Sequence, residues 1–552
     1  MKKLFPLLAF FISLQLFAQE DAWIYLKDKP SSATFLATPL TMLSQRSLER
    51  RTRQNIALDS KDVPVEATYY NQIKNTSGIT VLAKSKWLNA IHVQGTQTKI
   101  NSLKNTFTFI QSIEFADNSL NAGGKRLSKT NTITKRNKFA ETSTNFTYGN
   151  SANQIKMLKG DYLHTEGLTG TKAQIAIIDA GFLNVNTLPA FKRIRDNGQI
   201  LGGYDFVERN TNFYSGGSHG THVLSTIAGF IDKQFVGSAP DAKFYLFRTE
   251  DGANEVPLEE SLWVEAAERA DSLGVDVINT SLGYSTFDES RYNYSYADMD
   301  GKTAFISRGA EIGTSRGMLI VASAGNEGNG SWKYITAPAD APSVITVGAV
   351  NASKNIAGFS SFGPTSDNRV KPEILAQGQS VFILDYITGN SRTSNGTSFS
   401  APILAGLIAC MNENETFLLK SSQVKSSILN LKKAIFESSD RYNNPHEQYG
   451  YGIPNFETAL NSYRSSLSVD EQDFIKEISV YPNPIKNQFT IKTTLKNLNE
   501  VSITIFNVIG KKVYEKKSLK SKTINVSGLN TGIYILKIMT ETQQKTIKLV
   551  KK

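Results

Sequence analysis

The chain of 552 residues is too long for one ordinary domain, and roughly three or four are expected. Its hydrophobic content of 40% and its 30 phenylalanines supply a large core, which excludes a chain that is disordered throughout. The net charge of +11 suggests a nucleic-acid-binding protein. However, residues 476–552 alone hold 15 lysines and 4 glutamates with no Asp or Arg, so the excess charge belongs to the tail and the rest of the chain is neutral overall. We therefore expect no nucleic-acid partner. The single cysteine, Cys410, excludes an intrachain disulfide and is expected to be a buried core residue on an apolar helix.

The first 18 residues have the layout of a secretory signal peptide. Two lysines precede an apolar run over residues 4–17, and Ala18 follows it. This run is too short to remain as a membrane span, and no later apolar run reaches the roughly 18–20 residues that a span needs. We expect residues 1–18 to be removed, the chain to be exported, and the mature chain to have no transmembrane segment.

Residues 19–145 have a mixed helix and strand pattern. A polar helix is predicted near residues 41–55, two strands and a helix within 78–106, and a further strand over 107–115. Strands and helices in this arrangement predict a small α+β domain. The segment 119–150 is polar, basic and poor in apolar residues, so we expect an exposed linker that proteases can cut.

Residues 151–465 alternate apolar, strand-like runs with longer helical stretches. This alternation predicts an α/β fold, in which a parallel sheet carries helices on both faces. A second linker is expected at 465–474. The tail, 476–552, contains several short strand patterns and no helix pattern, which predicts a small β-sandwich.

Four short stretches of the α/β region place reactive side chains where a strand ends or a helix begins. Asp179 ends an apolar strand, Asn326 follows another, and His219 and Ser398 stand at helix starts. The carboxyl ends of parallel strands are where ligands bind in open sheets. A carboxylate, an imidazole and a hydroxyl gathered there form a nucleophilic triad, in which Asp orients His and His accepts the Ser proton. Asn326 would then donate a side-chain N–H to a developing oxyanion.

Each of these residues has a simpler interpretation when taken alone. A serine at a helix start is most often an N-cap, and an aspartate at a strand end is most often a turn residue. His219 and His222 stand three apart and could bind a metal, but the His-Glu-x-x-His pattern of a zinc protease is absent. Only the combination favours catalysis.

The combination resembles the subtilisin-like serine proteases, also called subtilases or peptidase family S8. The local sequences "HGTHV", "GNEG" and "GTSFSAP" nearly repeat the signatures of that family, and the chain order Asp, His, Ser is the subtilisin order. The resemblance assigns His219, and not His222, as the base. It assigns Ser398, and not Ser394 or Ser400, as the nucleophile.

The resemblance also implies a substrate groove. Two short segments would hold the peptide in extended form, and one residue would form the base of the pocket for the residue before the scissile bond. These residues are Ser281, Leu282, Gly283, Ser323, Ala324, Gly325 and, at the base, Thr336. Because Thr336 is uncharged, we expect no strict demand for a charged residue there, and Glu327 at the rim would favour Lys or Arg only mildly.

The flanking regions have resemblances of their own. Residues 19–145 resemble a subtilase propeptide, a ferredoxin-like domain that acts as intramolecular chaperone and inhibitor. Residues 476–552, with "YPNP" and "GIYILKI", resemble the sorting domain of the type IX secretion system of Gram-negative bacteria. The alternative for this tail is an ordinary carbohydrate-binding or adhesion sandwich.

Together the resemblances imply a secreted serine endopeptidase that is made as a zymogen. Its expected partners are protein or peptide substrates, its own propeptide and the type IX machinery, and its expected location is outside the cell or on its surface. No cofactor is required for the chemistry; no metal ligand is identified, and structural calcium is left open because no Asp-x-Asp-x-Asp loop appears. The alternative is a catalytically silent surface module that binds peptide or matrix on the same fold.

Overall fold

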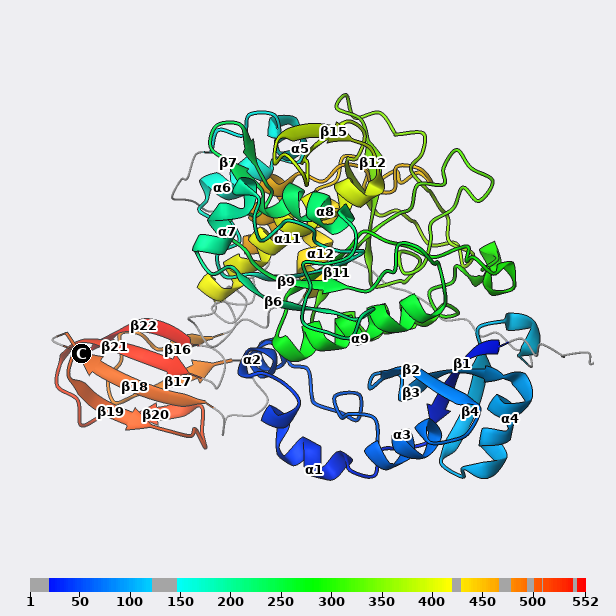
Figure 1. The fold of residues 1–552 in the computed structure, drawn as a ribbon. Coiled ribbons are helices and arrows are strands. Elements are labelled where there is room, and N and C mark those ends of the chain that lie inside the picture. The colour runs from blue at the N-terminus through cyan, green and yellow to red at the C-terminus, as the bar shows by residue number, and fades with distance from the viewer. Residues whose placement is uncertain are drawn as a thin grey trace, which may run out of the picture.

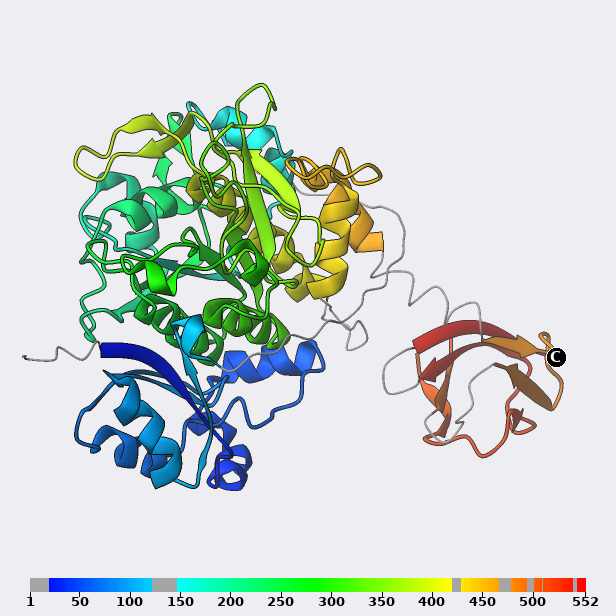
Figure 2. The same cartoon turned by 90° about the vertical axis from the view of Figure 1, so that its right-hand side faces the viewer.

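The computed structural model describes residues 19–121, 146–418, 428–465, 478–493, 501–508, 510–539 and 544–552. The predicted signal peptide (1–18) and most of both predicted linkers lie outside the described residues. The chain has an N-terminal α+β part, a central α/β part and a C-terminal strand-rich part, and the last stands apart from the other two in both views (Figures 1 and 2). These parts confirm the predicted fold class.

The N-terminal part is one antiparallel sheet with two helices across its outer face. Its strands are β1 (Gln19–Leu26), β2 (Ile79–Ser85), β3 (Ala90–Thr96) and β4 (Ile110–Phe115), in the spatial order β2-β3-β1-β4. The helices are α1 (Ser32–Ala37), α2 (Gln45–Arg53), α3 (Ala67–Lys74) and α4 (Gln97–Thr106), with 3-10 turns η1 (Pro39–Thr41) and η2 (Asn118–Leu120). Apolar residues of α3 and α4 pack on β1 and β3, so β1, α3, β2, β3, α4 and β4 follow the ferredoxin-like order.

The central part is built on a seven-stranded sheet in which every pairing is parallel. The spatial order is β13-β12-β11-β10-β5-β9-β6. The strands are β5 (Gln174–Asp179), β6 (Ile200–Asp205), β9 (Lys243–Arg248), β10 (Val277–Thr280), β11 (Leu319–Ser323), β12 (Ile345–Val350) and β13 (Ile374–Gln377).

Helices cover both faces of this sheet, which explains the unbroken apolar runs of its strands. The helices α8 (His219–Ala228) and α11 (Thr397–Leu418) lie on one face, and α9 (Leu258–Leu273) and α10 (Phe305–Ser315) lie on the other. Along β5, Ile175 and Ile177 join the core with α8 and α11, whereas Ala176 and Ile178 join the core with α9 and α10.

Shorter elements complete the central part. They are α5 (Ala152–Lys156), α6 (Gly160–Thr165), η3 (Pro189–Phe191), α7 (Lys192–Asp196), η4 (Ser290–Tyr292), η5 (Tyr296–Asp298), α12 (Ile428–Glu437), a last helix over 456–465, and the hairpins β7–β8 (Phe230–Ile231, Phe235–Val236) and β14–β15 (Val381–Leu384, Ser391–Ser394). Cys410 is fully buried within α11, as predicted. No helix among the described residues is long and apolar enough to cross a bilayer.

The C-terminal part consists of two antiparallel sheets around an apolar core, as the sequence predicts. One sheet has the order β16-β17-β20 and the other β19-β18-β21-β22. Their strands are β16 (Ser479–Tyr481), β17 (Gln488–Lys492), β18 (Ser502–Asn507), β19 (Lys512–Lys516), β20 (Thr523–Asn525), β21 (Gly532–Met539) and β22 (Gln544–Lys551).

The N-terminal sheet packs against α9 and α10 of the central part, and Figure 1 shows α9 lying along β2 and β3. Trp23 stacks on Phe305 with ring centroids 4.7 Å apart, and its indole N–H donates to Ser261 Oγ at 2.8 Å. Glu268 of α9 accepts hydrogen bonds from the Ser85 hydroxyl at 2.6 Å and from the Trp87 backbone N–H at 2.9 Å. The two parts therefore share one core and a set of buried polar contacts.

A buried ion cluster adds to this contact. Asp271 of α9 is fully buried and pairs with Arg50 and Arg51, two buried residues of α2. Arg51 also pairs with Asp62 at 2.9 Å. Removing one partner from such a cluster leaves uncompensated buried charge, which costs about 3–5 kcal/mol.

We predict that Asp271→Ala lowers the free energy of unfolding by about 3–5 kcal/mol, because both arginines lose their shared carboxylate. The measurement is urea unfolding of the full chain carrying Ser398→Ala, followed by tryptophan fluorescence, since Trp23 and Trp87 lie at this contact. Glu49→Gln on the exposed side of α2 is the matched control and should change little. Equal stability of the Asp271→Ala and Glu49→Gln chains would contradict the prediction.

Candidate active site

The four predicted catalytic residues meet at the carboxyl edge of the central sheet. Asp179 is the last residue of β5, and Asn326 lies three residues after the end of β11. His219 begins α8, and Ser398 is the second residue of α11. Pro402 follows within the first turns of α11, where the missing N–H costs least. All four predicted residues line the same pocket.

Asp179 and His219 are joined by a short hydrogen bond. Asp179 Oδ1 lies 2.7 Å from His219 Nδ1 and also accepts the Ala180 backbone N–H at 2.8 Å. The Asp179 side chain is 1% exposed, whereas that of His219 is 40% exposed. The partial burial of the His219 ring disfavours its charged form, the imidazolium. The Asp179 charge and hydrogen bond outweigh this effect and raise the pKa of His219 above its ordinary value. Since Nδ1 carries the proton shared with Asp179, Nε2 is the nitrogen left to accept one.

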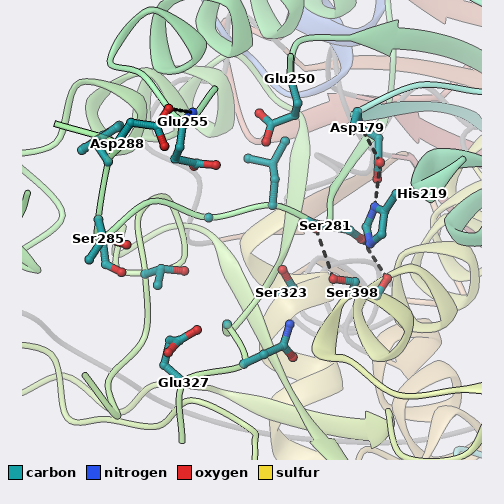
Figure 3. Close-up of a pocket in the computed structure, with 18 residues that line it drawn as sticks. Asp179, His219, Glu250, Glu255, Ser281, Ser285, Asp288, Ser323, Glu327 and Ser398 are labelled. Carbon is teal, nitrogen blue, oxygen red and sulfur yellow. Dashed lines mark hydrogen bonds and ion pairs between the residues drawn. The ribbon is translucent and has the colours of Figure 1, made fainter. Parts of the chain in front are cut away.

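Ser398 is held to the end of β10 by two reciprocal hydrogen bonds. Its hydroxyl donates to the Ser281 carbonyl oxygen at 3.3 Å, and the Ser281 hydroxyl donates to the Ser398 carbonyl oxygen at 3.0 Å. Ser281 Oγ in turn accepts the side-chain amide of Asn279 at 3.1 Å. These contacts fix the start of α11 against the sheet, with Ser398 at the pocket wall (Figure 3).

The Asn326 side chain is oriented by Thr397, the first residue of α11. Asn326 Oδ1 accepts the Thr397 backbone N–H at 2.9 Å and the Thr397 hydroxyl at 3.1 Å. With its oxygen engaged in this way, the amide presents its N–H₂ group as donor. Thr397 is a functional neighbour that the sequence analysis did not single out.

His222 has a different environment from His219. It is 8% exposed, its Nε2 lies 3.3 Å from an Arg392 guanidinium nitrogen, and its ring lies edge-on to Tyr386. Burial, and then the Arg392 and His219 charges, lower the pKa of His222 to about 4. His222 is therefore neutral near pH 7 and packs as a structural residue.

Of the seven predicted substrate-binding residues, six line the pocket. They are Ser281, Leu282, Gly283, Ser323, Gly325 and Thr336. The seventh, Ala324, is fully buried and donates its backbone N–H to the Val347 carbonyl oxygen at 3.0 Å, because it continues the pairing of β11 with β12.

Two glycines leave room for the pocket. A Cβ on Gly283 would stand 2.2 Å from Thr336 Oγ1, so a side chain there would collide with the pocket base. Gly325 has φ +105°, a backbone conformation that residues with side chains rarely adopt. Thr336 itself is buried, and its Oγ1 has no hydrogen-bond partner among the described residues.

The pocket has a volume of about 570 Å³ and is more acidic than the sequence analysis anticipated. Besides Asp179 and Glu327, it is lined by Glu250, Glu255 and Asp288 (Figure 3). Glu250 lies just after the end of β9. The rule that ligands bind at the carboxyl ends of parallel strands, which singled out Asp179, therefore applies to Glu250 as well. Glu255 and Asp288 come from long loops, for which the sequence offers no comparable signal.

Glu250, Glu255 and Glu259 also form the one group among the described residues in which three His, Cys, Asp or Glu side chains could share a metal ion, with ligand atoms within 4.8 Å of one another. Carboxylate oxygens are the ligands that calcium prefers. A shared set of acidic groups does not by itself define a metal site, so no calcium site is inferred from it.

A carboxylate, an imidazole and a hydroxyl around one pocket are the groups of a serine-dependent hydrolase. Comparison with known sequences gives the family. Residues 170–452 match the subtilase family, and curated subtilisins are similar to this chain. The chain belongs to the subtilase family, and it is a serine-type peptidase.

Three relatives illustrate the extent of the similarity. Subtilisin NAT of Bacillus subtilis subsp. natto and subtilisin E of Bacillus subtilis (strain 168) are each 33% identical over 310 residues, which is 55% of this chain and 70% of theirs. Subtilisin DY of Bacillus licheniformis is 30% identical over 307 residues, 55% of this chain and 97% of its own. Among solved structures, the prenylagaramide maturation protease PagA aligns with a TM-score of 0.41 and 22% identity, over 56% of this chain and 96% of that one.

The flanking parts match two further families. Residues 21–136 match a peptidase S8 propeptide domain of Bacteroidota, and residues 479–552 match a secretion system C-terminal sorting domain. The chain is therefore a serine protease made with a propeptide, as a zymogen, and its type IX sorting domain directs it to the outside of the cell or the cell surface.

We predict that His219 titrates above the ordinary histidine pKa of about 6.5, because the Asp179 carboxylate stabilises its imidazolium. Asp179→Asn should lower that pKa, since burial then acts without the opposing charge. The measurement is an NMR pH titration of histidine-labelled full chain carrying Ser398→Ala, with the His219 signal assigned through His219→Gln. His222 is the internal reference and should show no titration between about pH 5 and 8. A His219 pKa that is unchanged in Asp179→Asn would refute this account.

Proposed function

We propose that the chain is a secreted serine endopeptidase in which Asp179, His219 and Ser398 form the catalytic triad and Asn326 contributes to the oxyanion hole. The observation that carries this proposal is the 2.7 Å contact between Asp179 and His219, at a pocket that Ser398 and Asn326 also line. It is supported by the raised pKa of His219, which suits a base that must accept a proton.

In the acylation step, Ser398 Oγ attacks the carbonyl carbon of the scissile peptide bond. Its proton turns from the Ser281 carbonyl oxygen, which accepts it in the resting chain, to Nε2 of His219. Asp179 stabilises the imidazolium that results. The tetrahedral intermediate collapses as the C–N bond breaks and His219 donates the proton to the leaving amine, which leaves an ester on Ser398.

Deacylation repeats these steps with water in place of the serine hydroxyl. Water attacks the ester carbon and gives its proton to His219, which then returns a proton to Ser398 Oγ as the carboxylic acid product leaves. In both steps negative charge develops on the former carbonyl oxygen. The Asn326 side-chain N–H and the Ser398 backbone N–H are the proposed donors to that oxygen, and Thr397 is a positioning residue that holds the Asn326 amide by its oxygen.

The substrate would lie extended between the two glycine-containing segments, Ser281–Gly283 and Ser323–Gly325. Such walls bind the peptide backbone and do not require a chain terminus, which supports cleavage within a polypeptide. Thr336 would form the base of the pocket for the residue before the scissile bond. Because Ala324 is buried away from the pocket, its neighbours Ser323 and Gly325 would make the contacts to the peptide from this segment.

The proposed division of the chain follows the sequence analysis. Residues 1–18 would be the signal peptide, 19–145 an inhibitory and chaperoning propeptide, 151–465 the catalytic domain, and 476–552 a sorting domain removed on export by the type IX system. The chemistry needs no cofactor. The alternative, a catalytically silent module that binds peptide or matrix, would keep the same pocket without turnover.

We expect Ser398→Ala to abolish hydrolysis of casein while the chain still folds, because the attacking oxygen is lost. Asn326→Ala should lower kcat by about 10²–10³, the cost of removing one oxyanion donor in a subtilisin. The assay compares both variants with the unaltered chain, with and without a sulfonyl fluoride that modifies reactive serines.

Ser394→Ala is the matched control, because this serine lies in β15, four residues before the proposed nucleophile, and does not line the pocket. Its activity should equal that of the unaltered chain. Wild-type rates in Ser398→Ala would refute the nucleophile assignment, and an unaltered chain without activity after propeptide removal would favour the silent module.

We further expect the Ser398→Ala chain to retain residues 19–145 when it is expressed alone, because processing of the propeptide would be carried out by the same active site. The measurement is the mass of the purified product. Complete removal of the segment in that variant would show that another protease performs the cleavage.

A further inference from the structure

We propose that the acidic side of the pocket binds a Lys or Arg side chain of the substrate, two to four residues before the scissile bond, and that Glu255 and Glu250 contact its charge. This inference rests on the proposed function, because it concerns the substrate of the same pocket. It assigns specificity to two residues that have no part in the proposed bond chemistry.

The lining of the pocket is strongly acidic. Of the 18 lining residues five are acidic, and none is Lys or Arg. Figure 3 shows Glu250 and Glu255 facing the same space, with Asp288 beside Glu255, on the side of the pocket opposite Glu327. A peptide in the groove would therefore meet several carboxyl groups close together on the Glu255 side.

The Glu255 and Glu250 carboxylates differ in how they are held. The Glu255 carboxylate has no hydrogen-bond or ion-pair partner among the residues that the structure describes, while its backbone is fixed by reciprocal 3.0 Å bonds with Asp288. Glu250 accepts the hydroxyl of the buried Tyr284 and is thereby kept in place. Glu259, in contrast, accepts the Asp251 backbone N–H at 2.7 Å, and this bond ties the loop that carries Glu250 and Glu255 to the start of α9.

No Lys or Arg among the described residues forms an ion pair with Glu250 or Glu255. The nearby Arg248 pairs with Asp205 at 2.9 Å. Burial, and then Asp288, raise the pKa of Glu255 to about 7, and burial, and then Glu259, raise the pKa of Glu250. Carboxylates crowded in this way gain from an ammonium or guanidinium group that enters between them.

The walls next to these carboxylates suit the rest of a basic side chain. Leu282 and Phe287 line the same pocket, and the methylene stem of Lys or Arg packs well on apolar surface while its charged end reaches polar groups. At the other end, the buried Thr336 Oγ1 faces Gly283 and Gly325 and has no partner among the described residues. An occupant that reaches both regions is a peptide and not a small ion.

The chain itself contains a segment of the required chemistry. Residues 122–145, between the N-terminal and central parts, hold six basic residues and one acidic residue. Two Lys-Arg pairs, Lys125–Arg126 and Lys135–Arg136, stand within it. These residues lie outside the described structure, but their composition is complementary to the pocket, and they include the expected site of propeptide cleavage.

The test uses enzyme purified from cells that express the full chain. Peptides of one sequence carry either Lys or norleucine, its uncharged analogue, at each of the four positions before the scissile bond, and kcat/KM is measured for each. We expect a Lys-to-norleucine ratio of about tenfold or more at one position from two to four, the effect of one charge-assisted contact.

Glu255→Gln and Glu250→Gln should each bring that ratio towards one, and Glu250→Gln keeps an acceptor for Tyr284. Glu208→Gln, which removes the same charge from an exposed position outside the pocket, should leave the ratio unchanged. Titration of reactive serine with a sulfonyl fluoride counts folded sites in every variant, so that a misfolded variant is recognised.

The outcomes separate this inference from the proposed function. Cleavage of all peptides at equal rates would overturn the inference and leave the proposed function intact, whereas no cleavage and no serine labelling would overturn the proposed function. A Lys preference confined to the residue directly before the scissile bond, and abolished by Glu327→Gln alone, would also overturn the inference. So would calcium binding that is lost in Glu255→Gln together with a ratio near one, because the carboxylates would then belong to a metal site.

Discussion

The carboxyl edge of the parallel sheet is the constraint on which the candidate site depends. β5, β10 and β11 run side by side, so that Asp179, Ser281 and Asn326, which are far apart in the sequence, emerge at one edge. Parallel strands need crossover helices, and these helices return to the opposite edge of the sheet. The loops at the carboxyl edge are thereby free to form a pocket, while the helices bury both faces.

The hydrogen bonds around α11 then convert an approximate arrangement into a fixed one. Ser398 and Ser281 exchange two bonds across the end of β10, and Thr397 holds the oxygen of Asn326. The start of one helix is thus joined to two neighbouring strand ends. Donors and acceptors fixed before substrate arrives need no reorganisation when charge develops, which is the main advantage of such a site over water.

The sequence was informative wherever a residue's role follows from its position in a regular element. Asp179 at a strand end and His219 and Ser398 at helix starts could be placed because strands and helices have strong apolar periodicity. The α+β character of the first part and the terminal sandwich followed from the same patterns, whereas the ferredoxin-like order was implied by the resemblance to subtilase propeptides. Ala324 shows the limit of a motif: it lies within a wall segment, but its N–H pairs with Val347 and its side chain points into the core.

Contacts between distant segments could not be predicted in this way. Arg50 and Arg51 belong to a polar helix pattern, yet they are buried because Asp271, more than two hundred residues away, lies opposite them. Glu255 lies in a loop without periodicity, and its place in the pocket depends on how that loop pairs with Asp288. Both cases depend on tertiary geometry that no local spacing encodes.

The acidic residues at these two places also differ in a way that bears on the proposed substrate preference. At the contact between the first two parts, the charge of Asp271 is balanced within the chain by Arg50 and Arg51. In the pocket, the half-buried Glu255 carboxylate has no such partner among the described residues, and burial and the neighbouring Asp288 raise its pKa to about 7. Without a cation beside it, a carboxyl group with such a pKa is partly protonated near neutral pH, whereas a neighbouring cation favours its charged form. On the proposed function, a Lys or Arg side chain of the substrate would supply that cation, because Glu255 lines the pocket in which the peptide would lie.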